Sequence, residues 1–430
     1  MQSRIAKARQ LIKSPVLVYL TATVLSRLGG FVLIPLYTRG LTEGEYGDYS
    51  LAVSAIALLP VLFSLGLNST IPKAFFGEAD PEVASRLVGG LARVALALTA
   101  VGCLVGVSVA VAVSRRSGLF APWEASCVMA AVLGAMAASV PDAYFRARQR
   151  PVPAAAFQLA QFILSVGAGV VLVRFFQRGL RGAIEALAFT NLVVGCVALG
   201  FIRLRLPGHA DRSMIRTALA FSLPLIPHFV ANWMQGAIDR WLLKSFGLTA
   251  QLGNYALASQ LASPIFMIIL AWNDTTSARL GEIFRDGGVA AMLRVRKRLY
   301  WGYVAIPLVF GTLLLAVRPL IVAVLGEGKF SVASRLLPLL VGSMVFEVLY
   351  YPSSNLLYFA GQTRAIAAVT LSSAAVSVLL NLVMIPRWGV EGAIAARTSA
   401  LVLRSLLISS LVHLLLVRRQ SRSDAAANAS

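Results

Sequence analysis

The chain alternates long apolar runs with short polar breaks along its whole length. Each run approaches or exceeds the roughly 20 apolar residues that an α-helix needs to cross a bilayer. Gly and Pro recur inside the runs, which membrane helices tolerate because neighbouring helices satisfy the freed backbone groups. The pattern predicts an all-α polytopic membrane protein with about twelve transmembrane helices, at 15–37, 47–71, 87–113, 119–143, 152–175, 182–203, 217–239, 250–272, 300–324, 333–359, 364–386 and 389–417.

Three stretches of the first half of the chain occur again in the second half. GLTEGEYGDYSLA at 40–52 aligns with GLTAQLGNYALA at 247–258, with one residue deleted. Two further pairs follow in the same order: AYFRARQR at 143–150 with LYFAGQTR at 357–364, and RGLRGAIEALA at 178–188 with WGVEGAIAART at 388–398. Three collinear pairs predict that a unit of six helices was duplicated.

The duplication predicts an N-terminal six-helix lobe at 1–205 and a C-terminal six-helix lobe at 206–430, with 203–216 as the linker. Because each copy has an even number of spans, both lobes enter the membrane from the same side. We therefore expect a pseudo-twofold axis along the membrane normal, an arrangement known from transporters.

The composition supports a membrane protein. The chain is 58% hydrophobic and 13% charged, whereas soluble domains are about half apolar and about a quarter charged. The net charge of +21 is of the kind that nucleic-acid-binding proteins carry. Here, however, the positive residues lie in short loops between apolar runs, where they indicate orientation. No nucleic-acid partner is predicted.

The distribution of these charges predicts the topology. With the N-terminus in the cytoplasm, the cytoplasmic loops carry 23 Lys and Arg residues and the opposite loops 11. This bias predicts that both termini are cytoplasmic. The longest internal loop is expected at 273–299. It is either a short surface helix whose basic residues face anionic lipid or a solvated turn.

Motifs for a metal, a cofactor or catalysis are missing from the sequence. Cys103, Cys127 and Cys196 lie inside apolar runs without ligand spacing, and the three His residues form no cluster. GEGKFS at 326–331 lacks the upstream glycine and the Ser/Thr of a phosphate-binding loop. A glycosyltransferase or ligase acting on prenyl lipids would carry a large extramembrane loop with clustered acids or His. The sequence predicts no cofactor, no metal, no catalytic residue and no enzyme.

Three stretches carry a family resemblance: SRLGGFVLIPLYTRGLTEGEYGDYSLA at 26–52, FSLPLIPHFVANWMQGAIDRWLLKSFGLTAQLGNYALASQLASP at 221–264, and the GxxGAI pair at 179–184 and 389–394. They resemble the polysaccharide-transporter branch of the multidrug/oligosaccharidyl-lipid/polysaccharide exporter superfamily, which contains O-antigen and exopolysaccharide flippases. The resemblance implies two six-helix lobes forming a V around a central cationic cavity. It also implies alternating-access export of an undecaprenyl-pyrophosphate-linked oligosaccharide across a bacterial inner membrane. Membrane lipids, a polysaccharide polymerase and glycosyltransferases are the partners it implies.

Charged residues inside predicted spans are the candidate site, because an ionised side chain there is costly and usually faces a cavity or a partner. Arg27 is the only charge of span 15–37 and lies in SRLGGF, which resembles the flippase motif whose Arg faces the cavity. A structural salt bridge is the alternative for Arg27. Arg93 lies nearer the inner end of its span, where a side chain can also snorkel to water.

The seventh span carries a second group of candidates. Asn232 and Gln235 could hydrogen-bond sugar hydroxyls or only neighbouring helices. Asp239 and Arg240 end this span at its outer side. They either form a gate or cavity rim or anchor the helix at the membrane interface.

The last span carries Arg397 and Arg404, which lie seven residues apart and therefore on one helix face. Glu347, in the middle of the tenth span, is a candidate partner for one of them, and a structural Glu347–Arg404 pair is one interpretation. The other is a substrate path, since guanidinium groups offer paired donors to pyrophosphate oxygens. The predicted substrate-binding residues are Arg27, Arg93, Asn232, Gln235, Arg240, Arg397 and Arg404, with Asp239 and Glu347 as gate or charge partners.

Two other functions are open. A multidrug antiporter of the same superfamily would export cations and prefer acidic cavity residues, whereas arginines outnumber acids within these spans. A non-transporting membrane scaffold would need no buried arginines.

Overall fold

The apolar runs fold as helices, because a backbone inside a membrane can satisfy its polar groups only within a helix or a closed barrel. The computed structural model describes residues 31–76, 80–117, 121–148, 150–325 and 329–417, and nearly all of them are helical. This agrees with the predicted all-α class. Arg27 lies outside the described residues.

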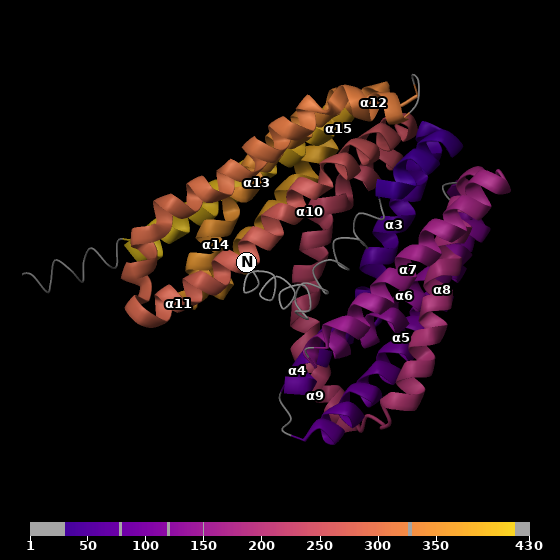
Figure 1. The fold of residues 1–430 in the computed structure, drawn as a ribbon, viewed down its shortest axis with the longest axis horizontal. Helices are drawn as coiled ribbons and strands as arrows, with labels where there is room; N and C mark the ends of the chain where they lie inside the picture. Colours follow the sequence, from indigo (N-terminus) through magenta and orange to yellow (C-terminus); the bar gives the residue numbers. More distant parts are fainter. Residues whose placement is uncertain (1–30, 77–79, 118–120, 149, 326–328, 418–430) are drawn as a thin grey trace, which may run out of the picture. The chain divides into compact units, whose positions relative to one another are not determined.

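The described chain divides into two compact units (Figure 1). The first comprises 31–41 and 48–229. Its elements are α3 (Glu43–Phe63, whose first turn belongs to the second unit), η1 (Leu67–Ser69), α4 (Thr70–Phe76), α5 (Pro81–Ser117), α6 (Pro122–Ala147), α7 (Pro151–Gly169), the π-helical turn η2 (Val170–Phe175), α8 (Gly179–Arg205), α9 (Arg212–Ser222) and η3 (Leu223–Leu225).

The second unit comprises 42–47 and the described residues from 230 onward. Its elements are most of α10 (Ile226–Ser245), α11 (Thr249–Ala316), α12 (Arg318–Leu325), α13 (Ser331–Val348), α14 (Tyr350–Phe359), α15 (Thr363–Val412) and the π-helical turn η4 (His413–Val417). The division falls inside α10. The lobe boundary at 205/206 was predicted from the sequence repeats and not from contacts, and it stays a prediction.

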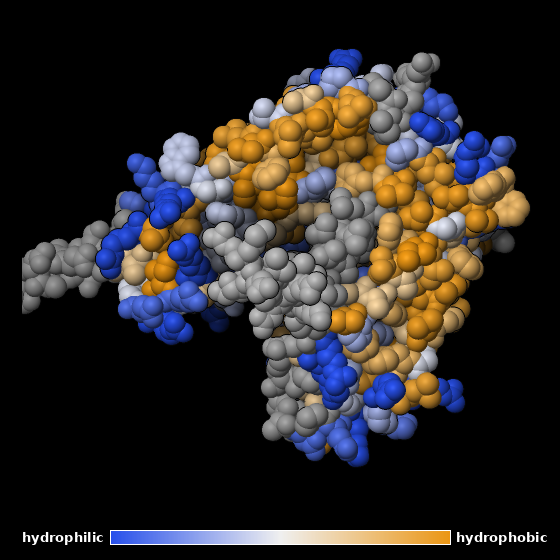
Figure 2. All heavy atoms as spheres, viewed as in Figure 1, coloured by the Kyte–Doolittle hydropathy of each residue, from blue (hydrophilic) through white to orange (hydrophobic). Residues whose placement is uncertain are grey.

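Nine helical segments of the described residues are long and apolar enough to cross a membrane: Glu43–Phe63, Glu82–Ser114, Pro122–Ala147, Val152–Phe175, Gly179–Arg205, Arg212–Ser245, Thr249–Ala316, Ser331–Phe359 and Thr363–Leu416. Within each unit, hydrophobic residues cover the flanks of the helices and hydrophilic residues gather at their ends (Figure 2). The chain is therefore a multi-pass membrane protein.

In the first unit, α6 packs against α5, α7 and α8. Its contact with α8 depends on two glycines: a Cβ atom at Gly195 would lie 2.7 Å from the Gly134 Cα. Small residues allow membrane helices to approach this closely. Next to this contact, Met136 and Val140 of α6 pack with Ile202 in the buried core of the unit.

In the second unit, the stretch 273–299, expected to be either a short surface helix or a solvated turn, lies within α11. This stretch is helical except at Gly288, whose φ of 63° and ψ of −157° reverse the chain, as the sharp turn of α11 in Figure 1 shows. The helix persists because Leu280 and Met292 are buried against Leu356 and Ile408. The sequence signal was the helical spacing of Leu280, Ile283 and Phe284, which the many charges of the stretch obscured.

The repeated GxxGAI motif folds into the same turn in each unit. Gly179 and Gly389 have φ values of 53° and 57°, a left-handed conformation that glycine adopts without strain. Three residues later, Gly182 lies against the backbone carbonyl of Leu172, and Gly392 lies against that of Met384. Each motif therefore reverses the chain and packs the next helix tightly onto the preceding one.

Candidate functional site

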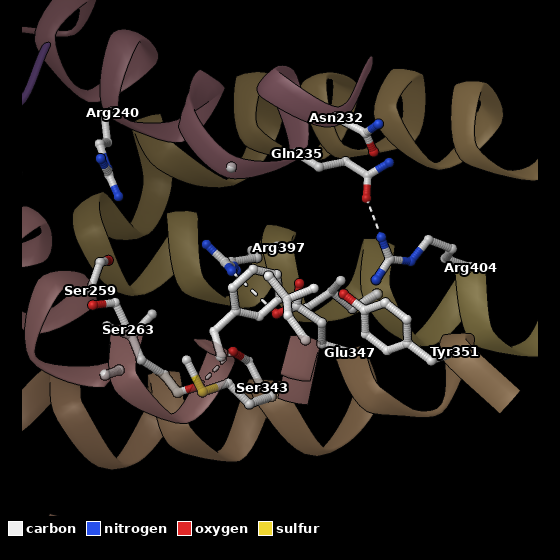
Figure 3. A pocket seen from close by; sticks show the side chains of 17 residues that line it. Asn232, Gln235, Arg240, Ser259, Ser263, Ser343, Glu347, Tyr351, Arg397 and Arg404 are labelled. Carbon is white, nitrogen blue, oxygen red and sulfur yellow. Dashed lines mark hydrogen bonds and ion pairs between the residues drawn. The ribbon is translucent and has the colours of Figure 1, made fainter. Parts of the chain in front are cut away.

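A cavity of about 500 Å³ lies within the second unit, between α10, α11, α13 and α15 (Figure 3). We call it the arginine cavity, because three arginines and a single glutamate are the charged residues of the described chain that line it. Its polar and charged lining residues are Asn232, Gln235, Arg240, Ser259, Ser263, Ser343, Glu347, Tyr351, Arg397 and Arg404.

Helical spacing brings these residues to one space. On α10, the lining residues Asn232, Gly236 and Arg240 recur every four residues and therefore share one face, with Gln235 beside them. On α15, Arg397 and Arg404 both line the cavity, so the predicted shared face is confirmed. In Figure 3 the labelled side chains of α10 and of α15 project into the same cavity.

Arg397 pairs with Glu347. The Arg397 Nη2 donates to the Glu347 Oε2 at 3.5 Å, and the two side chains are only 18% and 11% exposed. Glu347 is the only acid among the lining residues that the structure describes, so this pair removes one of the three positive charges they carry. The structure thus replaces the predicted Glu347–Arg404 pair with a Glu347–Arg397 pair.

Arg404 is held by neutral groups instead. Its Nη1 donates to the Gln235 Oε1, and its guanidinium lies 4.4 Å from the centre of the Tyr350 ring. The Gln235 Nε2 donates to the Thr370 carbonyl at 3.2 Å, which turns the Gln235 oxygen toward Arg404. A cation–π contact and an amide oxygen orient the guanidinium without neutralising its charge.

The cavity collects unsatisfied hydrogen-bond donors. Among the described residues, seven buried side-chain nitrogen or oxygen atoms have no hydrogen-bond partner, and five of them belong to residues that line this cavity: Arg240 Nε, Ser259 Oγ, Arg397 Nε, Arg404 Nε and Arg404 Nη2. A buried unsatisfied polar atom is costly and calls for a ligand or a solvent partner. Four of the five atoms are guanidinium nitrogens, which can only donate, so the matching ligand is an acceptor that carries negative charge.

Asp239 lies behind the cavity rather than in its lining. Its carboxylate is buried, accepts a hydrogen bond from the Tyr255 hydroxyl and accepts the backbone N–H of Arg240 at 2.8 Å. These contacts fix the turn of α10 from which Arg240 projects. The geometry supports a positioning role for Asp239.

Arg93 lies in the first unit, away from this cavity. Its guanidinium donates to the backbone carbonyls of Leu206, at 3.0 Å, and of Gly208. It therefore holds the chain segment that follows α8 against α5. Arg27 lies outside the described residues, so six of the nine predicted site residues meet in one cavity, and their role in binding stays a prediction.

Four polar lining residues were not predicted: Ser259, Ser263, Ser343 and Tyr351. Ser259 and Ser263 are four residues apart and share a face of α11. Their spacing was readable from the sequence, but serines also occur wherever membrane helices pack closely. Among the described residues, no three His, Cys, Asp or Glu side chains come together as metal ligands.

Comparison with known proteins identifies the family. The model of the polysaccharide biosynthesis protein family matches residues 12–276. The chain is 22% identical to Lsg locus putative protein 1 of Haemophilus influenzae over 367 residues, which are 83% of this chain and 87% of that protein.

Solved structures share the fold. The lipid II flippase MurJ, in an inward closed conformation, aligns with a TM-score of 0.72 at 11% identity, over 92% of this chain and 87% of that one. An inward-facing multidrug resistance MATE family transporter of the MOP superfamily aligns with a TM-score of 0.71 at 14% identity, over 95% and 99% of the two chains. The chain belongs to the polysaccharide biosynthesis protein family, and it shares the fold of these solved structures of the MOP superfamily.

Proposed function

We propose that this protein is a flippase that exports a lipid-linked oligosaccharide, carried on undecaprenyl pyrophosphate, for the synthesis of a surface polysaccharide. The observation that carries the proposal is the arginine cavity, where buried guanidinium nitrogens of three arginines have no hydrogen-bond partner among the residues that the structure describes. A pyrophosphate offers several charged acceptor oxygens, and guanidinium groups bind such oxygens in pairs. The Asn, Gln and Ser side chains of the lining supply hydrogen bonds for sugar hydroxyls.

In this proposal Arg240, Arg397 and Arg404 bind the head group, and Glu347 holds Arg397 in place and limits the positive charge. Asn232 and Gln235 bind sugar, and Asp239 positions Arg240. Arg27 remains a predicted ligand of the same head group. We leave Arg93 out of the binding set, because its hydrogen bonds go to backbone carbonyls.

The same proposal includes the finer architecture and location. Gly288 and Gly389 break two of the nine segments of the described chain. Together with the span that the sequence predicts at 15–37, this supports twelve crossings in two six-helix lobes. Alternating access of the cavity, a bacterial inner membrane location and cytoplasmic termini complete it. A polysaccharide polymerase and glycosyltransferases are its expected partners.

The test is deletion of the gene followed by complementation. We expect the deletion strain to lose surface polysaccharide and to accumulate oligosaccharide-pyrophosphate-undecaprenol, measured by mass spectrometry of extracted lipids. The wild-type gene should reverse both effects, and an Arg404→Gln gene should not. Unchanged polysaccharide together with increased retention of cationic dyes would overturn the proposal in favour of a multidrug antiporter.

A further inference from the structure

A second cavity, of about 660 Å³, lies in the first unit at the ends of four helices. We call it the basic pocket, because among the described residues Arg86, Arg148, Arg150 and Arg205 line it, with Glu82 as the one acid. Arg148 is the C-cap residue of α6, Arg150 is the N-cap residue of α7, and Arg205 is the last residue of α8. The pocket therefore lies where the apolar parts of these helices end, at the level expected for lipid head groups.

The acid in the pocket does not balance the four arginines. The Glu82 Oε2 lies 3.9 Å from the Arg86 Nη2, and both side chains are largely exposed, so this ion pair is weak. Arg148 is held in place by other contacts: it lies 4.9 Å from the centre of the Tyr144 ring and donates to the Ser85 hydroxyl at 3.4 Å. The pocket has an excess of three positive charges, with one guanidinium already oriented on an aromatic ring.

One wall of the basic pocket is apolar. Tyr144, Phe145 and Phe201 contact one another, with ring centres 5.1–5.8 Å apart. All three aromatic residues line the pocket together with the arginines. An aromatic wall next to a cluster of guanidinium groups matches a ligand with phosphate at one end and acyl chains at the other.

The repeated sequence changes one of the pocket arginines. In the alignment of 143–150 with 357–364, Arg148 corresponds to Gln362, whereas Arg150 corresponds to Arg364. The second copy of the repeat therefore supplies a substitution with which to test Arg148.

We propose that the basic pocket binds a multiply charged phosphate group, carried by the head group of an anionic membrane lipid or by a soluble diphosphate. The aromatic wall of Tyr144, Phe145 and Phe201 favours the lipid. This site is separate from the arginine cavity, and the proposal does not depend on what that cavity transports.

The test uses the purified full chain in phosphatidylcholine nanodiscs with increasing fractions of cardiolipin. Native mass spectrometry counts retained cardiolipin, and the thermal unfolding temperature gives an apparent affinity. The variants are Arg148→Gln, which introduces the residue of the second copy, and Arg205→Gln. Arg203→Gln is the matched control, since Arg203 is an exposed arginine on the same helix that does not line the pocket.

We expect cardiolipin to be retained in preference to phosphatidylcholine, and each pocket variant to weaken the apparent affinity about fivefold. Arg203→Gln should leave the affinity unchanged. In a second arm, inorganic pyrophosphate replaces cardiolipin, and Arg404→Gln serves as the control for binding in the arginine cavity. A pyrophosphate effect that the pocket variants lose and Arg404→Gln keeps, without cardiolipin retention, assigns the site to a soluble diphosphate. Equal losses in Arg203→Gln and the pocket variants, or no effect of either probe, would overturn the proposal.

Discussion

Arg397 and Glu347 form a buried ion pair across the arginine cavity, with 3.5 Å between the Arg397 Nη2 and the Glu347 Oε2. Arg404, on the same face of the same helix, instead donates to the amide oxygen of Gln235. The two arginines of α15 therefore differ in electrostatics. Arg397 is largely neutralised by its partner, whereas Arg404 keeps its charge for a ligand.

The first prediction concerns this pairing. Glu347→Gln leaves Arg397 buried without its partner, and breaking a buried pair in this way typically costs about 3–5 kcal/mol. The variant should show reduced abundance in membranes and a lower unfolding temperature in detergent. Adding Arg397→Gln should restore most of the loss.

The matched control for this rescue is Arg404→Gln in the same Glu347→Gln background. It removes a positive charge from the same helix face but not the partner of Glu347, so it should restore little. Equal rescue by both arginine variants would show that only the total charge of the cavity matters.

The second prediction separates binding from folding at Arg404. Arg404→Gln removes a buried charge that has no acidic partner, so abundance should stay close to that of the wild type. Export should fall about 10- to 100-fold, since a hydrogen bond to a charged group contributes roughly 1.5–3 kcal/mol. Arg404→Lys should recover only part of it, because an ammonium group lacks the planar fork. Arg364→Gln, on the exposed first turn of α15, is the control and should export normally.

The third prediction tests the contact between α6 and α8. Gly195→Ala places a methyl group against the Gly134 backbone, with 2.7 Å to its Cα atom, so the helices must separate and the unfolding temperature should drop. Gly200 lies on the same helix with nothing within 4 Å of its added Cβ. Gly200→Ala should be neutral or stabilising, by up to about 1 kcal/mol from helix propensity. A similar drop for both variants would contradict the close approach.

The fourth prediction concerns the N-cap of α9. The Asp211 carboxylate accepts the backbone N–H of Met214 at 2.7 Å and the Ser213 hydroxyl, and these bonds lower its pKa below the ordinary 3.8. A lowered pKa stabilises the folded protein above that ordinary value and loses the effect as the pH falls through the folded-state pKa. Asp211→Ala should therefore lower the unfolding temperature at neutral pH, and the gap to the wild type should narrow in acid below pH 3.8.

Asp211→Asn is the control for this cap. Its amide oxygen can still accept the Met214 N–H, so the unfolding temperature should fall less than in Asp211→Ala. Because asparagine does not ionise, the difference between the two variants should not depend on pH. If the difference in unfolding temperature between the wild type and Asp211→Ala stayed constant as the pH fell, the charged cap would be ruled out.

The fifth prediction is the topology, measured by cysteine labelling in a background without Cys103, Cys127 and Cys196. Asp286→Cys, near the α11 turn, should react with an impermeant reagent only after the cells are opened. Ser245→Cys, at the exposed end of α10, should react in intact cells. The reverse pattern would invert the orientation that the positive loops predict.

The sequence by itself determined that the chain is an all-α membrane protein of this family. Apolar runs of membrane-spanning length and positively charged loops are local features of the sequence. A run that is long enough to cross the bilayer as a helix predicts such a helix directly. The same holds for the shared face of Arg397 and Arg404, because helical periodicity alone places residues seven apart on one side. The turn at Gly389 also fell where the predicted spans met, since the repeated motif provided a glycine there.

Only the tertiary structure decided how the charged residues are used. Arg93 and Arg397 look alike in sequence, as arginines within apolar runs, yet one holds the segment after α8 and the other pairs with Glu347. The packing of four helices decides which hydrogen-bond donors remain unsatisfied. It also decides that Ser259 and Arg240 line the same cavity. Helical period fixes the direction of a side chain from its own axis. Its partner is set by the rotation and spacing of the neighbouring helices, which result from many small contacts distributed along the chain.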